Sequence, residues 1–296
     1  MQTLVTGGAG FIGSHLVDAL RERGDAVAVL DDLSSGRGER IPNGVELRRV
    51  DVADDAAVAA ACAEVRPEVV FHLAAQIDVR ASVADPARDA RVNVAGTAGV
   101  LEGARRAGAQ RVLLASTAGV YGEPDVIPTP ETAPLAPFSP YGTSKAAAER
   151  YCALYARLHG LSTGVLRFGN VYGPRQDPHG EAGVIAIFAG AAREGRRVTI
   201  FGDGRQTRDY VYVGDVIDAF LAAAGSDHAG AVNVGTGRET SLLELVAELG
   251  LDAEHQPARA GDVERSCLDV ARAAEVLGWR AAWPVADGLR ATVAAA

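Results

Sequence analysis

Three glycines spaced three residues apart constrain the fold of this chain more than any other feature of its sequence. Gly7, Gly10 and Gly13 lie between a short apolar segment, residues 3–6, and a longer amphipathic segment, residues 11–23. This spacing, between a strand and a helix, lets backbone amides approach a pyrophosphate at the N-terminus of the helix. A glycine triplet in another setting would mark only a tight turn. Here the setting is present, so the motif predicts a dinucleotide-binding turn.

The first half of the chain continues this alternation of short apolar segments and longer helical ones. Strand, helix and strand in this order are typical of a parallel sheet with helices on both faces. The sequence therefore predicts an α/β fold, a doubly wound parallel sheet of the Rossmann type. The further predicted strands are residues 26–30, 45–50, 69–73, 112–116 and 163–168, and the predicted helices are residues 54–65, 88–107 and 141–159.

Beyond Asn170 the regular alternation ends, and Gly-Pro, Asp-Pro and His-Gly pairs mark a long loop. Ser241 and Asp269 are predicted N-caps of two late helices. We therefore expect a dinucleotide-binding domain over residues 1–168, to which residues 211–235 return, and a smaller interleaved α/β lobe for the substrate over residues 169–296. The later predicted helices are residues 184–193, 213–224, 241–249 and 269–277, and residues 198–201 are predicted to be extended.

Charge and cysteine content narrow the class of partner. The formal net charge is −9, with 38 acidic against 29 basic side chains. Nucleic acid and anionic membranes are recognised by basic faces, so neither is expected as a partner. The apolar run at the N-terminus is too short for a membrane span or a signal peptide. Because Cys62, Cys152 and Cys267 show neither metal-ligand spacing nor a disulfide framework, we expect a cytoplasmic protein without a metal.

A carboxylate, Asp31, ends the second predicted strand. A carboxylate about 20 residues beyond such glycines can accept hydrogen bonds from both hydroxyls of a ribose, and it would repel a 2′-phosphate. The alternative is an ordinary loop acid, a role that the neighbouring Asp32 can also fill. The position favours NAD over NADP as the cofactor.

The chain contains a single lysine, Lys145, among 29 basic side chains, and it follows Tyr141 by four residues. One helical turn separates the two positions, so both side chains lie on one face of a helix. Free tyrosine has a pKa of about 10, so a tyrosine that accepts a proton at neutral pH needs a nearby positive charge. An ammonium supplies that charge as a compact point, which a planar guanidinium does not. The pair indicates a tyrosine that acts as a base beside a bound cofactor.

Several segments resemble the extended short-chain dehydrogenase/reductase superfamily and, within it, the NAD-dependent epimerase/dehydratase family, closest to the UDP-glucose (UDP-galactose) 4-epimerases. The matching segments are residues 6–13, 31–36, 71–76 and 116–122, together with Asn93. His72, at a strand end, is interpreted as a core histidine and not as a catalytic one. The resemblance implies an NAD site formed by Gly7, Gly10, Phe11, Ile12, Gly13, Asp31, Asp32, Ser35, Gly36, Asp51, Val52, Leu73, Ala74, Ala75, Gln76, Asn93, Ser116, Tyr141, Lys145 and Phe168.

The same resemblance implies that Thr117, Tyr141 and Lys145 are catalytic. Tyr141 would take the proton of a sugar hydroxyl as hydride leaves the same carbon, and Thr117 would orient that hydroxyl. Related 4,6-dehydratases carry an Asp-Glu pair after the threonine, and related decarboxylases carry a glutamate, but this chain has Ala118 and Gly119. Without a second acid, the ketone at C4 can only take hydride back, on either face. The expected reaction is 4-epimerisation of a UDP-hexose with NAD as a bound catalyst.

The resemblance assigns most of the substrate site to the second half of the chain. Two arginines would hold the pyrophosphate there. Asp177 would repel the carboxylate of a uronate, whereas the small side chain of Ser266 leaves room for an N-acetyl group. The implied substrate-binding residues are Thr117, Tyr141, Asn170, Val184, Arg208, Arg259, Asp262 and Ser266.

Other interpretations of the same residues stay open. One is a 4-epimerase of UDP-N-acetylglucosamine or UDP-glucuronate, and a weaker one is net oxidation or reduction of the sugar. A different class is a non-catalytic NAD-binding regulator on the same fold. We also expect a homodimer that associates through residues 88–107 and 141–159.

Overall fold

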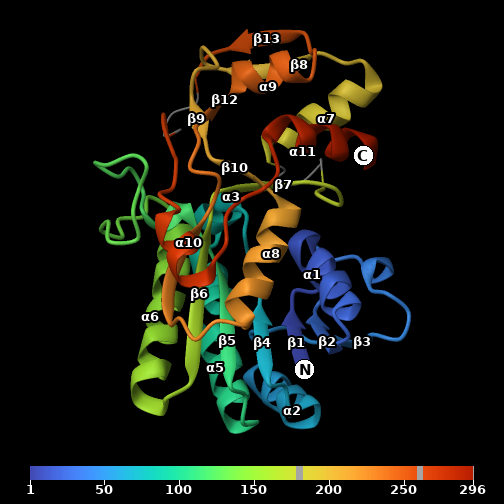
Figure 1. Cartoon of the computed structure of the whole chain (residues 1–296), viewed down its shortest axis with the longest axis vertical. Coiled ribbons are helices and arrows are strands. Elements are labelled where there is room, and N and C mark those ends of the chain that lie inside the picture. Colours follow the sequence, from blue (N-terminus) through green and yellow to red (C-terminus); the bar gives the residue numbers. More distant parts are fainter. Residues whose placement is uncertain (178–182, 259–262, 296) are drawn as a thin grey trace. The chain divides into compact units, whose positions relative to one another are not determined.

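The computed structural model describes residues 1–177, 183–258 and 263–295 of the chain, which divides into two compact units (Figure 1). Unit 1 comprises Met1–Gly122, Leu135–Arg167 and Ile217–Val232. Unit 2 comprises Glu123–Pro134, Phe168–Val216 and Asn233–Ala296. The segment that returns to unit 1 is thus shorter than residues 211–235, and the chain crosses between the units several times.

A seven-stranded sheet forms the centre of unit 1, in the order β11-β6-β5-β4-β1-β2-β3. The pairs β1–β2, β2–β3, β1–β4 and β4–β5 are parallel. The order reverses between β1 and β4, which is the switch point where doubly wound sheets bind ligands. The predicted doubly wound fold is confirmed. The strands are β1 Gln2–Thr6, β2 Ala26–Asp31, β3 Glu46–Arg49, β4 Val69–His72, β5 Arg111–Thr117, β6 Ser162–Phe168 and β11 Gly230–Val234.

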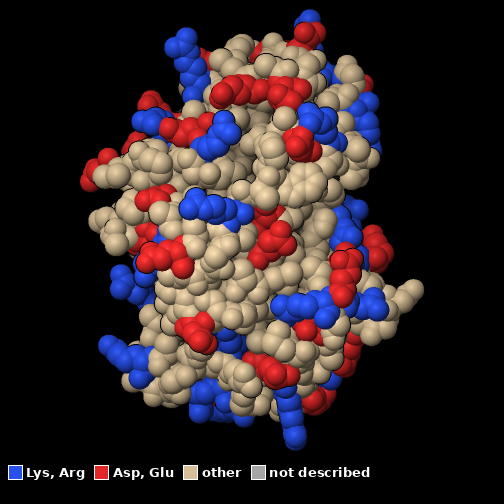
Figure 2. Space-filling model, viewed as in Figure 1, with Lys and Arg blue, Asp and Glu red and all other residues tan. Residues whose placement is uncertain are grey.

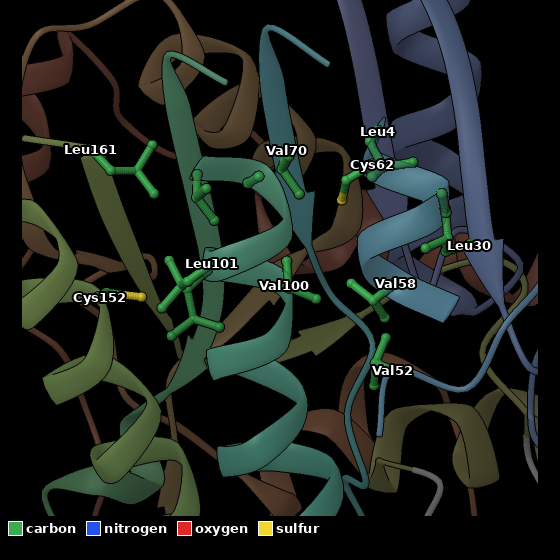
Figure 3. Close-up of a cluster of buried hydrophobic side chains, with 14 of the residues drawn as sticks. Leu4, Leu30, Val52, Val58, Cys62, Val70, Val100, Leu101, Cys152 and Leu161 are labelled. Carbon is green, nitrogen blue, oxygen red and sulfur yellow. The ribbon is translucent and has the colours of Figure 1, made fainter. Parts of the chain in front are cut away.

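Successive side chains of the central strands enter different cores, because side chains alternate along a strand. Leu4 and Val70 lie in the core beneath α2 (Asp55–Val65), α5 (Gly96–Arg106) and α6 (Pro140–His159), where the side chains of helices and strands point toward one another (Figure 3). On the other face, Phe71 meets Phe220 of α8 (Val213–Ala224) edge to face, with ring centroids 5.9 Å apart. Helix α1 (Phe11–Glu22) also lies on this second face, since Gly8 approaches Val17 and Val29. Both faces of the sheet are therefore covered.

The predicted helix over residues 88–107 is confirmed as helical backbone up to Arg106, but it is divided into α4 (Pro86–Ala90), a π-helical turn (Arg91–Ala95) and α5. Helix α3 (Val79–Ala84), which precedes it, was not predicted. Asp78 and Asp85 each cap a short helix, and Pro86 fixes the first turn of α4, so new helices begin where the sequence pattern shows none. The π-helical turn contains Asn93, whose side chain bonds to the loop after β4.

Unit 2 is built from short strand pairs and small helices. Ser241 caps α9 through a capping box with Glu244, as predicted, but Asp269 lies one residue before the N-cap of α10, which is Val270. Helix α11 was not predicted. Its Gly288 lets the helix approach the ring of Tyr172 closely. The pairs are β7 Asn170–Tyr172 with β10 Tyr210–Tyr212, β8 Val198–Phe201 with β13 Ala253–Gln256, and β9 Thr207–Arg208 with β12 Thr240–Ser241, and the helices are α7 Val184–Glu194, α9 Leu242–Glu248, α10 Ala271–Leu277 and α11 Val285–Ala295.

Charges of both signs are interspersed on the molecular face in Figure 2, with no continuous basic region on that face. Among the described residues, no helix has the length and apolarity to cross a membrane.

Candidate active site

The glycine turn after β1 leaves the N-terminus of α1 open to an anion. Gly7 has φ +72°, which favours glycine, and a Cβ at this position would lie 2.6 Å from the backbone nitrogen of Ala74. Gly10 is the N-cap of α1 and offers no side chain to the first helical amides, and the first turn carries no acid. Exposed amides and the positive end of the helix dipole together attract phosphate.

The carboxylate of Asp31 lies beside this turn. It accepts hydrogen bonds from the amides of Ala9 and Leu33, both at 2.9 Å. Asp31 is 5 % exposed, and burial raises its pKa although the two amides lower it. A Cβ on Gly36 would lie 2.7 Å from the Asp31 carboxylate, so the loop needs glycine there. Asp32, in contrast, accepts hydrogen bonds from its loop neighbour Ser34.

The loop after β4 closes the other side of the switch point. The amides of Leu73 and Ala74 donate to the backbone and side-chain oxygens of Thr6. Gln76 and Asn93 bond reciprocally: the Gln76 amide donates to Oδ1 of Asn93, and Nδ2 of Asn93 donates to the Gln76 carbonyl. These contacts join β1, β4 and the π-helical turn. Of the other predicted cofactor residues, Val52 packs against Gly96, while Asp51 and Ser35 lie exposed in loops.

His72 is an uncharged side chain in the core of unit 1, and its ring joins two threonines. Its Nδ1 lies 2.7 Å from the hydroxyl of Thr6 and its Nε2 lies 3.0 Å from the hydroxyl of Thr97. Burial, and after it the charge of Lys145, lowers the pKa of His72 to about 3. A ring bonded on both sides and uncharged at neutral pH fits the interpretation of a core histidine.

Acid should destabilise the fold in part through His72. Its pKa is about 3 in the folded chain and its ordinary value is 6.5, so the unfolded chain binds the proton first as pH falls below 6.5. The linkage costs about 2 kcal/mol of the free energy of unfolding between pH 7 and pH 5. Denaturant unfolding of the wild type and of His72→Gln at both pH values measures this contribution. An equal pH dependence of the two proteins would contradict it.

The β5 strand end and the first turns of α6 bring the predicted catalytic side chains together. Ser139 caps α6 by accepting from the amide of Gly142, and Pro140 begins the helix. The hydroxyl of Thr117, at the end of β5, accepts from the amide of Gly119 and hydrogen-bonds to the side chain of Tyr141. Thr117 and Tyr141 are therefore in contact, and Lys145 lies buried one helical turn after Tyr141 on α6; these three residues form the candidate catalytic cluster.

Burial governs the protonation of this cluster. It raises the pKa of Tyr141 to about 12, although the Thr117 hydrogen bond acts in the opposite direction. It lowers the pKa of Lys145 to about 8, although nearby carboxylates raise it. At neutral pH Lys145 therefore carries a charge and Tyr141 is a phenol. The phenol needs additional positive charge beside it to lose its proton readily.

Unit 2 contains a cavity of about 420 Å³ between α7, β8 and the strands β9 and β10. The predicted substrate residues Asn170, Val184 and Arg208 line it. The amide of Ser266 bonds to the carbonyl of Thr207, next to Arg208. Arg259 and Asp262 lie outside the described residues. Phe168 is buried at the end of β6.

Sequence reasoning missed several residues that line this cavity. Phe201 and Thr199 lie on β8, a strand that was expected, but the strand carries no signal that distinguishes a cavity wall from a core. The remaining lining residues that were not predicted are Ile187, Phe188, Ala191, Arg196, Arg197, Val198, Gln206, Tyr210 and Leu242.

The strand order reverses beside a glycine turn, and a tyrosine and a lysine lie one helical turn apart on α6. These features are typical of a dinucleotide-dependent enzyme of the Rossmann class. More specifically, the chain belongs to the NAD dependent epimerase/dehydratase family, whose model matches residues 3–235.

Individual relatives are similar over the full chain. The UDP-glucose 4-epimerase of Mycolicibacterium smegmatis is 50 % identical over 306 residues, which cover 99 % of this chain and 97 % of the relative. The crystal structure of the UDP-glucose 4-epimerase of Thermotoga maritima with UDP-glucose is 46 % identical, with a TM-score of 0.97 and coverage of 100 % and 98 %. The UDP-glucose 4-epimerase of Thermus thermophilus in complex with NAD is also 46 % identical, with a TM-score of 0.93 and the same coverage. NAD is the cofactor of this family.

Proposed function

We propose that the protein is an NAD-dependent isomerase that interconverts UDP-glucose and UDP-galactose by 4-epimerisation through a transient 4-keto sugar. The observation that carries the proposal is the cluster of Thr117, Tyr141 and Lys145, followed by Ala118 and Gly119 in place of the acids of dehydratases and decarboxylases. Identity of 45 to 50 % to relatives named as UDP-glucose 4-epimerases supports the same reaction.

The residues of unit 1 fit NAD. The N-terminus of α1 has no side-chain cap, so its amides are available to the pyrophosphate. The turn is tight enough to need glycine, because a Cβ at Gly7 would collide with the backbone of Ala74 and one at Gly13 with the backbone of Gly7. Asp31 beside that turn suits the adenosine ribose and disfavours a 2′-phosphate. When bound, NAD supplies reversible hydride acceptance. The other predicted NAD contacts are the residues named from the resemblance, including Phe168.

The chain's own residues would then remove the proton from the sugar O4 and return it. Thr117 orients the hydroxyl, and Tyr141 takes its proton as the carbonyl forms at C4. Lys145, charged at neutral pH, favours the phenolate that this step requires. With no second acid or base after Thr117, the 4-keto sugar can only be reduced again. Return of hydride to C4 and of the proton from Tyr141 to O4 completes either epimer.

We assign the cavity of unit 2 to the nucleotide part of the substrate. Arg208 is placed in its wall and carries the charge that a diphosphate requires. Asn170 adds an amide and Val184 an apolar wall. Arg259 and Asp262 are proposed to complete the pyrophosphate and ribose contacts. In this assignment unit 2 holds the nucleotide sugar, while unit 1 holds the cofactor.

The proposal includes a cytoplasmic homodimer. Cys62, Cys152 and Cys267 are all buried free thiols, which suits a reducing compartment. Tyr151 and Leu158 expose apolar surface on α6, seven residues apart and so on one face of the helix. This face supports the expected association through α5 and α6. Sedimentation of the purified protein at several concentrations tests it, and a monomer throughout would refute it.

A substrate panel tests the function. We expect the purified protein with NAD to interconvert UDP-glucose and UDP-galactose without added reductant and with little free NADH by absorbance near 340 nm. The panel also contains the N-acetyl forms and UDP-glucuronate, separated by chromatography. A second candidate substrate is UDP-N-acetylglucosamine, favoured by the small side chain of Ser266. Turnover of UDP-glucuronate alone would overturn the proposal.

A further inference from the structure

We propose that two buried carboxylates, Glu149 and Asp89, are positioning residues that hold the positive charge of Lys145. The role of this charge in catalysis rests on the proposed function. The arrangement of the carboxylates around Lys145 does not, so it can be tested separately. Both lie in unit 1, and neither belongs to the predicted catalytic, cofactor-binding or substrate-binding residues.

Glu149 lies one helical turn after Lys145 on α6, so the two side chains share a face of the helix. The Glu149 carboxylate is buried and fully bonded. It accepts from the hydroxyl of Ser116 at 2.5 Å and from Nη2 of Arg167 at 2.6 Å, and Nε of Arg167 lies 3.1 Å from both oxygens. Because Ser116 precedes Thr117, the same carboxylate ties the end of β5 to the helix that carries Tyr141 and Lys145.

Arg167 is itself held in place. Its Nη1 donates to the hydroxyl of Tyr121 at 2.8 Å, and its guanidinium carbon lies 5.0 Å from the centre of that ring. Arg167 and Glu149 form a bidentate, charge-assisted ion pair. This pair alone is neutral, so the charge of Lys145 needs a further anion to balance it in a site with little water.

Asp89 supplies that anion. It is 1 % exposed, and its Oδ1 accepts from Nε2 of Gln76 and Nδ2 of Asn93. Its Oδ2 has no hydrogen-bond partner among the described residues. A buried carboxylate oxygen left without a partner is costly, so such a group calls for an explanation beyond packing. Helix α4, which carries Asp89, packs against α6.

The groups around Lys145 leave only these two carboxylates as counter-charges within the part of the chain that the structure describes. His72, on β4, is neutral. The thiol of Cys152, on α6, has a pKa of about 12 and is neutral as well. Tyr141 is a phenol at neutral pH. Burial lowers the pKa of Lys145, and Glu149, Cys152 and Asp89 raise it, in that order. Two cations and two anions balance only when Lys145 is protonated, so the arrangement favours the ammonium.

The single lysine makes the test direct. In full-length protein labelled with lysine carrying ¹³C and ¹⁵N, all side-chain lysine signals come from Lys145, and their chemical shifts report its titration by NMR. We expect Glu149→Gln and Asp89→Asn each to lower the pKa of Lys145 by about one unit. Glu102→Gln, on the exposed face of α5, is the control and should leave the titration unchanged. Unchanged titration in both test variants would overturn the proposal.

Folding and function can be separated from this result. Asp89→Asn keeps the acceptor for Gln76 and Asn93, so it should fold even if Glu149→Gln does not. The double variant Glu149→Gln/Arg167→Met removes the neutral ion pair as a unit and leaves Asp89 to balance Lys145, so it should shift the titration less than Glu149→Gln does. In active protein, the alkaline limb of kcat/KM should move to lower pH with the titration. If the wild type has no epimerase activity but the test variants still shift the Lys145 titration, the proposed function is refuted and the present proposal stands.

Discussion

Replacing Tyr141 with phenylalanine is expected to lower kcat for the interconversion of UDP-glucose and UDP-galactose by about 10³-fold, because general acid–base groups contribute roughly that much. The change removes one hydroxyl and keeps the ring that fills the space beside Thr117. NAD affinity should therefore change little, since the pyrophosphate and adenosine contacts lie at the glycine turn and Asp31. Turnover by chromatography and NAD binding by calorimetry measure the two effects independently.

A matched control lies on the same helix. Tyr151 is partly exposed on α6, so Tyr151→Phe removes a hydroxyl of the same kind outside the cluster. It should leave kcat unchanged. Near-normal turnover in Tyr141→Phe would refute Tyr141 as the base. Loss of NAD binding together with turnover would instead show that the phenol holds the cofactor.

The parts of the fold that the sequence predicts correctly are those with local signals. Buried parallel strands such as β4 form short continuous apolar runs, and the helices between them have a different period. The segments that escaped prediction lack such periods. The strands β9 and β12 have two residues each, and α3 depends on a cap from a single aspartate. A pattern read over a window of about ten residues averages such features away.

The same distinction holds in the candidate site. Tyr141 and Lys145 can be paired from the sequence because both lie on one helix, one turn apart. Glu149 lies one turn further on, yet nothing in the sequence distinguishes it from a solvated helix acid. Its burial follows from Arg167 on β6 and Ser116 on β5, which reach it from 18 and 33 residues away in sequence. Contacts of this kind are properties of the folded chain only.

The largest effect on stability is expected from Gly13→Ala in the glycine turn. A Cβ at Gly13 would lie 2.1 Å from the carbonyl oxygen of Gly7 and 2.8 Å from the Cα of Gly8, both backbone atoms that cannot rotate away. The turn must open to admit the methyl group, at a cost of about 3 kcal/mol or more. Opening would also separate the amides that face the pyrophosphate. We therefore expect a lower melting temperature and no measurable NAD binding.

Gly190→Ala is the control for this prediction, because it makes the same chemical change with the opposite expected sign. Gly190 lies inside α7, and outside its own helix no described atom lies within 4 Å of the added Cβ. Alanine should stabilise such a helix by about 0.5–1 kcal/mol. Thermal unfolding and calorimetry of both variants make the comparison. A Gly13→Ala protein with wild-type melting and NAD affinity would mean that the turn can relax around a methyl group, and the close packing inferred for it would be wrong.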